Sequence, residues 1–173
     1  VYEKQLFPEK LLGEDSLPDW KTAGTTLFEN KALRAWTLDD QVVIASIKNK
    51  MHAISPAVME SLMEAIELAE NEYQGMVIWS GDAPFSVGAD LEATMPAFVV
   101  GGADAIDSIE GELQNLMMRL RYAQVPVVSA IHGMALGGGC ELAVYSARRV
   151  AHMESYIGLV EVGVGLIPGA GGL

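Results

Sequence analysis

The chain has 173 residues, half of them apolar, and carries a formal net charge of −12 from 23 acidic and 11 basic side chains. This size and composition suit one globular domain, and no apolar run approaches the ~18 to 20 residues that a membrane-spanning helix needs. The few scattered basic residues exclude an extended phosphate-binding face, so we expect a soluble domain with no nucleic-acid partner and no membrane insertion.

The first residues and the single cysteine give two further predictions, about the length of the whole polypeptide and its location. The chain opens Val-Tyr-Glu-Lys, without an initiator Met or the apolar stretch of a secretion signal, which predicts a piece of a longer polypeptide. The single cysteine, Cys140, cannot form an internal disulfide, and this fits a cytoplasmic location.

The N-terminal part divides into an irregular segment and a hairpin. Residues 1–27 show neither helical nor strand periodicity and are predicted to be a linker or a packed arm, which leaves residues 28–173 as the domain. Residues 32–37 and 42–47, separated by an acidic turn, predict the two strands of the hairpin.

An alternation of helices and strands follows. Ser55-Pro56 predicts the start of an amphipathic helix that runs to about residue 71. The strands predicted after it are residues 76–79, 125–131 and 149–152, and the helices are residues 106–120 and 140–147. This order indicates an α/β fold with largely parallel strands joined by right-handed crossovers.

Two strand-to-helix connections are rich in glycine, residues 85–90 and residues 132–139. The first turn of a helix has free backbone N–H groups, and small residues there let an anion or a developing oxyanion approach them closely. The two loops could therefore supply two donors. The alternative is that these glycines only form tight turns.

Two glutamates accompany these loops. Glu141 directly follows three glycines at a predicted helix start, and Glu161 lies among apolar and small residues. A carboxylate in apolar surroundings has a raised pKa, which suits proton transfer near neutral pH. The alternatives are a favourable interaction of Glu141 with the helix dipole and a buried ion pair for Glu161.

These segments resemble a known family. Residues 85–91 and residues 135–142 (Ala-Leu-Gly-Gly-Gly-Cys-Glu-Leu) resemble the two oxyanion-hole segments of the enoyl-CoA hydratase/isomerase, or crotonase, superfamily, and residues 161–172 resemble the segment that carries its second glutamate. The resemblance covers residues 32–173. It implies a fold of repeated ββα units, without the C-terminal helices of the family.

The resemblance also implies roles for individual residues. The N–H groups of Ala89 and Gly138 would hold the thioester oxygen as it becomes enolate-like. Glu141 would activate the water that attacks the β-carbon, and Glu161 would handle the proton delivered to the α-carbon. Because both glutamates are present, hydration of 2-enoyl-CoA thioesters is favoured over isomerisation. Residues implied to bind the substrate are Lys50, Met51, Ala53, Ile54, Gly88, Asp90, Leu91 and Gly137.

Cofactors and partners follow from the same resemblance. No metal and no cofactor is expected, since coenzyme A is part of the substrate. The chain resembles most closely the hydratase portion that follows the dehydrogenase in certain bacterial 3-hydroxyacyl-CoA dehydrogenase proteins, so we expect fusion to such a domain and a trimer of hydratase units in the intact protein. The family's C-terminal helices would close the acyl pocket.

Two other functions remain open from the sequence. One is another crotonase-type reaction, isomerisation or thioester hydrolysis, and the other is a non-catalytic module that binds CoA esters. Ala147 stands where the family commonly has aspartate. The three histidines, His52, His132 and His152, have no metal-ligand spacing and are predicted to be structural, and Cys140 is predicted to fill space.

Overall fold

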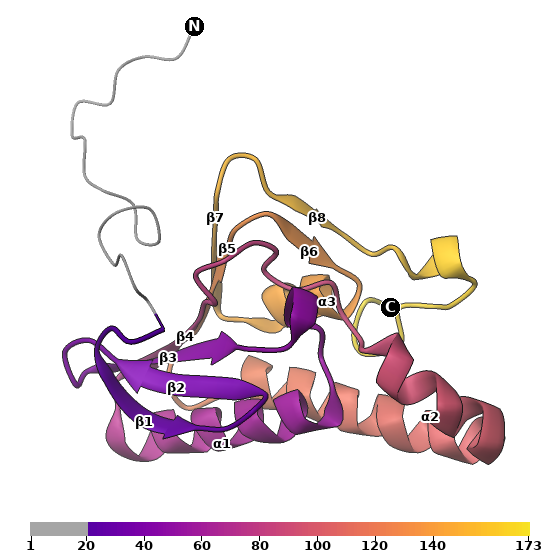
Figure 1. Ribbon diagram of the computed structural model, residues 1–173, viewed down its shortest axis with the longest axis horizontal. Coiled ribbons are helices and arrows are strands. Elements are labelled where there is room, and N and C mark those ends of the chain that lie inside the picture. The colour runs from indigo at the N-terminus through magenta and orange to yellow at the C-terminus, as the bar shows by residue number, and fades with distance from the viewer. Residues whose placement is uncertain (1–20) are drawn as a thin grey trace, which may run out of the picture.

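The computed structural model describes residues 21–173, apart from the side chains at positions 97 and 98. Most of the predicted linker or packed arm, residues 1–20, therefore lies outside the described residues. In chain order the elements are β1 (Thr25–Glu29), β2 (Leu33–Thr37), β3 (Val42–Ile47), the 3₁₀ helix η1 (Lys50–His52), α1 (Pro56–Glu72), β4 (Gly75–Ile78), α2 (Leu91–Arg121), β5 (Val127–Ile131), β6 (Met134–Leu136), α3 (Gly138–Tyr145), β7 (Arg148–Ala151), β8 (Tyr156–Gly158) and the 3₁₀ helix η2 (Glu161–Val164) (Figure 1).

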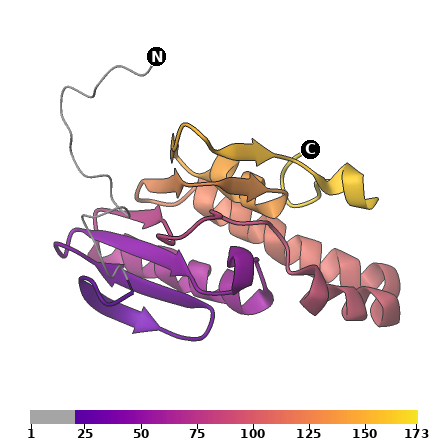
Figure 2. The ribbon, with the colours of Figure 1, turned by 45° about the horizontal axis from the view of Figure 1, so that its top comes forward.

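The larger sheet has six strands in the order β1-β2-β3-β4-β5-β7. The pairs β1–β2 and β2–β3 are antiparallel, and every pair from β3 to β7 is parallel. Helices α1 and α2 cover one face of this sheet (Figures 1 and 2). The predicted hairpin is present as β2 and β3, and the predicted α/β class with largely parallel strands is confirmed.

Regular structure begins earlier than the sequence pattern suggested. Strand β1 starts at Thr25, inside the segment predicted to be a linker or a packed arm. A bulge between Thr26 and Phe28 shifts the register against β2, so the residues on each face do not alternate simply along the strand. That interruption explains why the strand has no clear two-residue period.

A second, smaller row of extended segments explains how the repeating units are built. Strands β6 and β8 pair in parallel, and two isolated parallel bridges extend the row, Ser86 with Ala135 and Ile54 with Ala89. Each unit thus has a strand in the large sheet, a short extended segment in the second row and then a helix. The loops after the large-sheet strands are brought side by side by this row.

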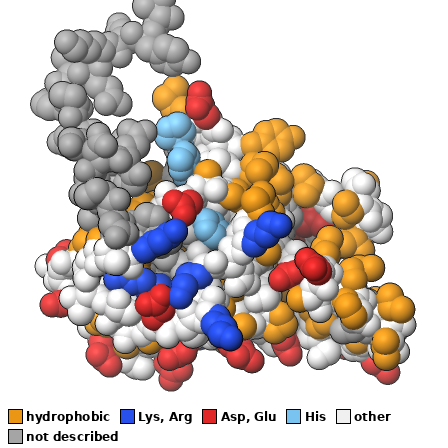
Figure 3. Space-filling view, in the orientation of Figure 1, with side chains coloured by type: hydrophobic (Ala, Val, Ile, Leu, Met, Phe, Trp, Pro, Cys, Tyr) orange, Lys and Arg blue, Asp and Glu red, His pale blue; other side chains and the backbone are white. Residues whose placement is uncertain are grey.

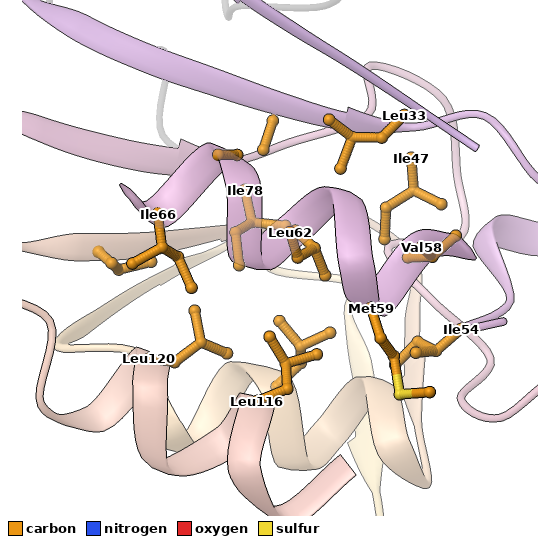
Figure 4. Close-up of a cluster of buried hydrophobic side chains, with 14 of the residues drawn as sticks. Leu33, Ile47, Ile54, Val58, Met59, Leu62, Ile66, Ile78, Leu116 and Leu120 are labelled. Atoms are coloured by element: carbon orange, nitrogen blue, oxygen red, sulfur yellow. The ribbon is translucent and has the colours of Figure 1, made fainter. Parts of the chain in front are cut away.

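The core lies between the large sheet and its helices. Apolar residues of α1 recur every four positions, as Val58, Leu62 and Ile66 do, and this face is fully buried. It contacts the sheet on one side and α2 on the other, where Leu116 and Leu120 are buried (Figure 4). The packed helices therefore hold the strand ends at fixed positions.

Helix α2 is longer than predicted and starts directly at the first glycine loop. The Asp90 carboxylate caps it by accepting a hydrogen bond from the Ala93 N–H at 3.1 Å. Pro96 and a break at Gly102, where φ is 59°, interrupt the helical pattern, so the sequence indicated only the second half. No helix within residues 21–173 is long and apolar enough to cross a membrane.

Candidate active site

Two backbone hydrogen bonds hold the first glycine loop to Ile54, and two more hold it to the second glycine loop. The N–H of Ile54 donates to the Gly88 carbonyl at 2.8 Å, and the Asp90 N–H donates back to the Ile54 carbonyl at 3.0 Å. On the other side, Ser86 donates to Met134 at 3.1 Å, and the Leu136 N–H donates to the Ser86 carbonyl at 2.9 Å. Loop 85–91 is thus clamped between Ile54, two residues after η1, and β6.

The clamp brings the two predicted oxyanion donors close to each other. A β-carbon placed on Gly138 would lie 3.5 Å from the Ala89 nitrogen, and one placed on Gly88 would lie 2.8 Å from the Gly138 nitrogen. Neither the Ala89 N–H nor the Gly138 N–H donates a hydrogen bond to any described residue. Two free backbone N–H donors that lie close together, one at the start of α3 and one just before α2, can hold one anionic oxygen.

Gly88 must be glycine for this approach. Its φ is +88°, which side-chain-bearing residues rarely adopt, and its missing side chain leaves room for Leu136 and Gly138. The Ser86 hydroxyl supports the turn by accepting from the Gly88 N–H at 3.2 Å and donating to the His52 carbonyl at 2.7 Å.

Glu141 lies in α3 and is 3% exposed. Its Oε1 accepts hydrogen bonds from the N–H groups of Gly171 and Gly172, at 2.9 and 2.8 Å. Burial raises the pKa of the Glu141 carboxyl, the two N–H donors oppose that rise, and the charges of Glu161 and Glu110 add to it. The carboxyl is therefore buried without a cation, inside a loop that holds one of its oxygens.

Glu161 reaches the same place from η2, of which it is the first residue. A β-carbon on Gly137 would lie 3.0 Å from Glu161 Oε1, so this carboxyl lies against the residue that precedes the donor Gly138. Its other oxygen, Oε2, is buried and has no hydrogen-bond partner. The structure thus brings together both predicted glutamates and both predicted donors.

A third carboxyl, Glu110 of α2, was not predicted from the sequence. Its Oε2 is also buried without a partner, and burial followed by the charge of Glu161 raises the pKa of the Glu110 carboxyl. One signal could have identified it. Glu110 stands four residues after Ile106 and three before Leu113, so it occupies the apolar stripe of its helix.

The predicted substrate-binding residues surround the clamp. Lys50 and Met51 are exposed in η1, and the Met51 carbonyl accepts from the Val87 N–H at 3.3 Å. Gly137, with φ of +53°, precedes α3. The others are Ala53, Ile54, Gly88, Asp90 and Leu91, which lie on the two neighbouring extended segments or directly after them. Their contact with substrate stays a prediction.

The three histidines and Cys140 have surroundings that suit a structural role. His52 is buried, and its Nδ1 lies 2.6 Å from the Pro84 carbonyl oxygen, while the ring centroids of His132 and His152 lie 5.1 Å apart with the rings tilted by 59°. Within residues 21–173, no three His, Cys, Asp or Glu side chains are grouped so that they could hold a metal ion. Cys140 is buried, and burial together with the charges of Glu141 and Glu161 raises the pKa of its thiol, which disfavours the nucleophilic thiolate.

The departure at Ala147 has a local compensation. Ala147 is exposed between α3 and β7. The Arg149 guanidinium donates to the carbonyls of Ala143, Val144 and Ser146 at 3.3, 2.9 and 3.2 Å, and so satisfies the C-terminal end of α3. The missing aspartate therefore leaves the position of Glu141 on this helix intact.

A groove of about 420 Å³ lies elsewhere, on the face of the large sheet opposite α1 and α2. Trp79, His132 and Val150 contribute to its walls, and neither the glutamates nor the two donors Ala89 and Gly138 do. We place the active site at the loops because free donors and buried carboxyls converge only there among the described residues.

Comparison with known proteins identifies the class to which this fold and site belong. The chain superimposes on the crystal structure of an enoyl-CoA hydratase from Polaromonas sp. JS666 with a TM-score of 0.74 and 26% identity, over 80% of this chain and 55% of that one. A family model described as Enoyl-CoA hydratase/isomerase matches residues 39–173. The chain belongs to this family and has its crotonase-like fold.

Two curated relatives narrow the comparison. The chain is 38% identical over 152 residues to a probable 3-hydroxyacyl-CoA dehydrogenase of Bacillus subtilis (strain 168), covering 88% of this chain and 18% of that protein. It is 39% identical over 127 residues to a putative fatty acid oxidation complex trifunctional enzyme of Rickettsia felis, covering 73% of this chain and 18% of that protein. The chain thus spans less than a fifth of these relatives.

Proposed function

We propose that this chain adds water across the double bond of 2-enoyl-CoA thioesters in fatty acid oxidation or a related acyl-CoA pathway. One observation carries the proposal, namely that Glu161 lies against the loop that carries the two free N–H donors, while Glu141, on the helix that begins at one donor, interacts electrostatically with Glu161. Hydration needs one group to take a proton from water and another to give a proton to carbon, and the site offers a carboxyl for each.

The donors would act on the thioester oxygen. As water attacks the β-carbon, negative charge collects on that oxygen, and the N–H groups of Ala89 and Gly138 would stabilise it without rearrangement because the clamp already fixes them. Removal of one such donor typically costs roughly 3 to 4 kcal/mol of barrier.

The carboxyls have surroundings that suit different roles. Glu141 would accept a proton from the attacking water, because its raised pKa makes the carboxylate a stronger base and two N–H groups fix its Oε1. Glu161, whose Oε2 is buried without a hydrogen-bond partner and whose Oε1 lies against Gly137, would deliver a proton to the α-carbon. After turnover Glu141 holds the extra proton and Glu161 lacks one, so the two must exchange a proton through solvent.

Isomerisation is the nearest alternative, because the family includes both activities. Moving a double bond transfers one proton between two carbons and needs only one carboxyl. The buried Glu141, with two backbone groups dedicated to it, favours hydration over that alternative.

The coenzyme A part would lie along η1 and the start of α2. On the face shown in Figure 3, basic side chains gather over β1 to β3 and η1, although the whole chain is acidic. Lys50 is an exposed cation there, and the neighbouring Lys48 forms an ion pair with Glu29 at 2.6 Å. Such a local positive region suits the phosphates of an acyl-CoA.

For the intact protein we infer fusion to a 3-hydroxyacyl-CoA dehydrogenase domain, as the printed name of the Bacillus subtilis relative suggests. The hydration product, a 3-hydroxyacyl-CoA, is what such a dehydrogenase would oxidise. A trimer of hydratase units and a cytoplasmic location belong to the same proposal. No cofactor is needed, since the chemistry uses carboxyls and backbone groups.

The test follows the loss of conjugated-thioester absorbance on mixing crotonyl-CoA with the intact protein. Glu141→Gln and Glu161→Gln should each lower kcat by about 10² to 10⁴-fold, the usual contribution of a general acid or base. Glu112→Gln removes the same charge from an exposed position of α2 and should leave the rate unchanged.

Three outcomes decide between the functions. Hydration that persists in both active-site variants contradicts the assigned roles. Conversion of a 3-enoyl-CoA that depends on Glu161 alone, without hydration, identifies an isomerase. Binding of the CoA ester without turnover of either substrate identifies a non-catalytic module.

A further inference from the structure

Helix α2 contacts the active-site loop at two successive turns. A β-carbon on Gly169 would lie 2.8 Å from Glu110 Oε2, and the Gln114 side chain donates to the Gly169 carbonyl at 2.9 Å. The same loop, residues 168–172, supplies the two N–H groups that hold Glu141. Both ribbon views show this C-terminal loop beside α2 (Figures 1 and 2). Glu110 is therefore part of the site and not of the helix surface.

Two buried oxygens in this site lack a donor, Glu110 Oε2 and Glu161 Oε2. A buried carboxylate oxygen without a hydrogen bond is strongly unfavourable, so each oxygen needs a proton or a donor. No ion pair within residues 21–173 includes either glutamate. One proton placed on Glu110 would supply a donor to the other carboxyl and would satisfy both oxygens.

The charges around Glu110 all oppose its ionisation. The charge of Glu161, in η2, raises the pKa of the Glu110 carboxyl, the Glu110 charge raises the pKa of Glu141, in α3, and loop 168–172 contains no titratable residue. On α2 itself, Asp107 and Glu112 are exposed. Burial and the charge of Glu161 raise the pKa of the Glu110 carboxyl, as in carboxyl pairs that cannot both be charged.

We propose that Glu110 is a positioning residue that stays protonated at neutral pH and donates a hydrogen bond to Glu161 Oε2. The proton of Glu161 is then confined to Oε1, the oxygen that lies against Gly137 and the oxyanion donors. When Glu161 gives that proton to the α-carbon, its new negative charge already has a donor on Oε2. Glu110 neither gains nor loses a proton in the cycle. The catalytic consequence rests on the proposed hydration, whereas the protonated state of Glu110 does not.

Substitutions separate a donor from a space-filling side chain. Glu110→Leu keeps the approximate volume but removes the donor, and kcat should fall about 100-fold, the scale of a misplaced catalytic group, with KM little changed. Glu110→Gln keeps an N–H donor that cannot ionise, so it should recover at least about tenfold of that loss. Its rate should also decline less at alkaline pH than that of the unaltered protein. Glu112→Gln is the matched control and should match the unaltered protein in rate and pH profile.

The protonation state is measured without turnover, by the carbonyl-stretch infrared band of protonated carboxyls at pH 7. The expected result is a band in the unaltered protein that loses the contribution of one carboxyl in Glu110→Gln and is unchanged in Glu112→Gln. That result supports the proposal even if crotonyl-CoA is not hydrated, in which case the proposed function alone fails. A Glu110 carboxyl that is fully ionised at pH 7 overturns the proposal. So does a hydratase in which the Leu and Gln variants have equal rates.

Discussion

The oxyanion region, residues 85–91 and 134–141, differs sharply from the carboxylate arm, residues 156–167, which carries Glu161. In the oxyanion region a β-carbon on Gly139 would meet the Ser86 carbonyl oxygen at 2.4 Å, because the backbones are in contact. In the arm, a β-carbon on Gly158, Gly163 or Gly165 would meet nothing within 4 Å.

The side chains show the same difference. Val162 is 80% exposed and Ile167 69% exposed, whereas Phe85 and Ala135 are buried. In Figure 3, hydrophobic side chains gather on the surface around this arm. The chain therefore fixes its two N–H donors through its own packing, while Glu161 is held by the β6–β8 pairing and by its contact with Gly137. The two halves of the site depend on different kinds of contact.

The largest expected effect tests the rigid half. Gly88→Ala places a β-carbon 2.8 Å from both the Gly138 nitrogen and the Leu136 oxygen, at a φ of +88°. Since both neighbours are backbone atoms, the donors must separate, and kcat/KM for crotonyl-CoA should fall by about 10² to 10³-fold. Thermal unfolding should show a loss of about 1 to 3 kcal/mol. Gly111→Ala, in an open position of α2, is the control. Unchanged hydration in Gly88→Ala would contradict the assignment of these donors.

The contact between the two halves gives the second test. Gly137→Ala places a β-carbon 3.0 Å from Glu161 Oε1, at a φ of +53°. The neighbour is the end of a side chain that can move, so we expect a smaller fall in kcat, about tenfold to hundredfold, from a displaced carboxyl. Oxyanion binding should be less affected, so the KM for crotonyl-CoA should change little. An equal fall in Gly137→Ala and Gly88→Ala would show that the arm is as rigid as the oxyanion region.

The sequence predicts the rigid half better than the arm. Amphipathic periodicity identifies α1, and short apolar runs identify β2 to β5, because those patterns are set by burial. The glycine loops and Glu141 are apparent because glycines at a helix start restrict the chemistry that can occur there. The family resemblance then assigns their roles.

The remaining features depend on contacts between distant segments. Strands β6 and β8 have three residues each, too few for a two-residue period to be detected. The N-terminal half of α2 contains Pro96 and ends at Gly102, which weakens the helical pattern. The Oε2 atom of Glu110 is buried where loop 168–172 lies against α2. No local pattern specifies such an approach.

The third test uses the pH dependence of stability. The pKa of the Glu141 carboxyl is raised in the folded protein, so the folded state binds more protons than the unfolded state, and stability falls as pH rises above the ordinary carboxyl range. Glu141→Gln removes this penalty and keeps an oxygen for the Gly171 and Gly172 N–H groups. At pH 7.5 it should stabilise the protein by about 1 kcal/mol, with a gain that shrinks towards about pH 4.5. Thermal unfolding at both pH values checks this, and a constant difference would contradict it.

The smallest effect tests the open half. Gly163→Ala adds a methyl group where nothing lies within 4 Å, so unfolding should change by no more than about 0.5 kcal/mol and hydration by less than about twofold. The measurement pairs this chain with the intact protein. Equal, small changes in both mean that this side of the arm is free. A loss confined to the intact protein would mean that another segment packs on the arm there, so that the position of Glu161 is set from outside this chain. A loss in both would contradict the difference between the two regions.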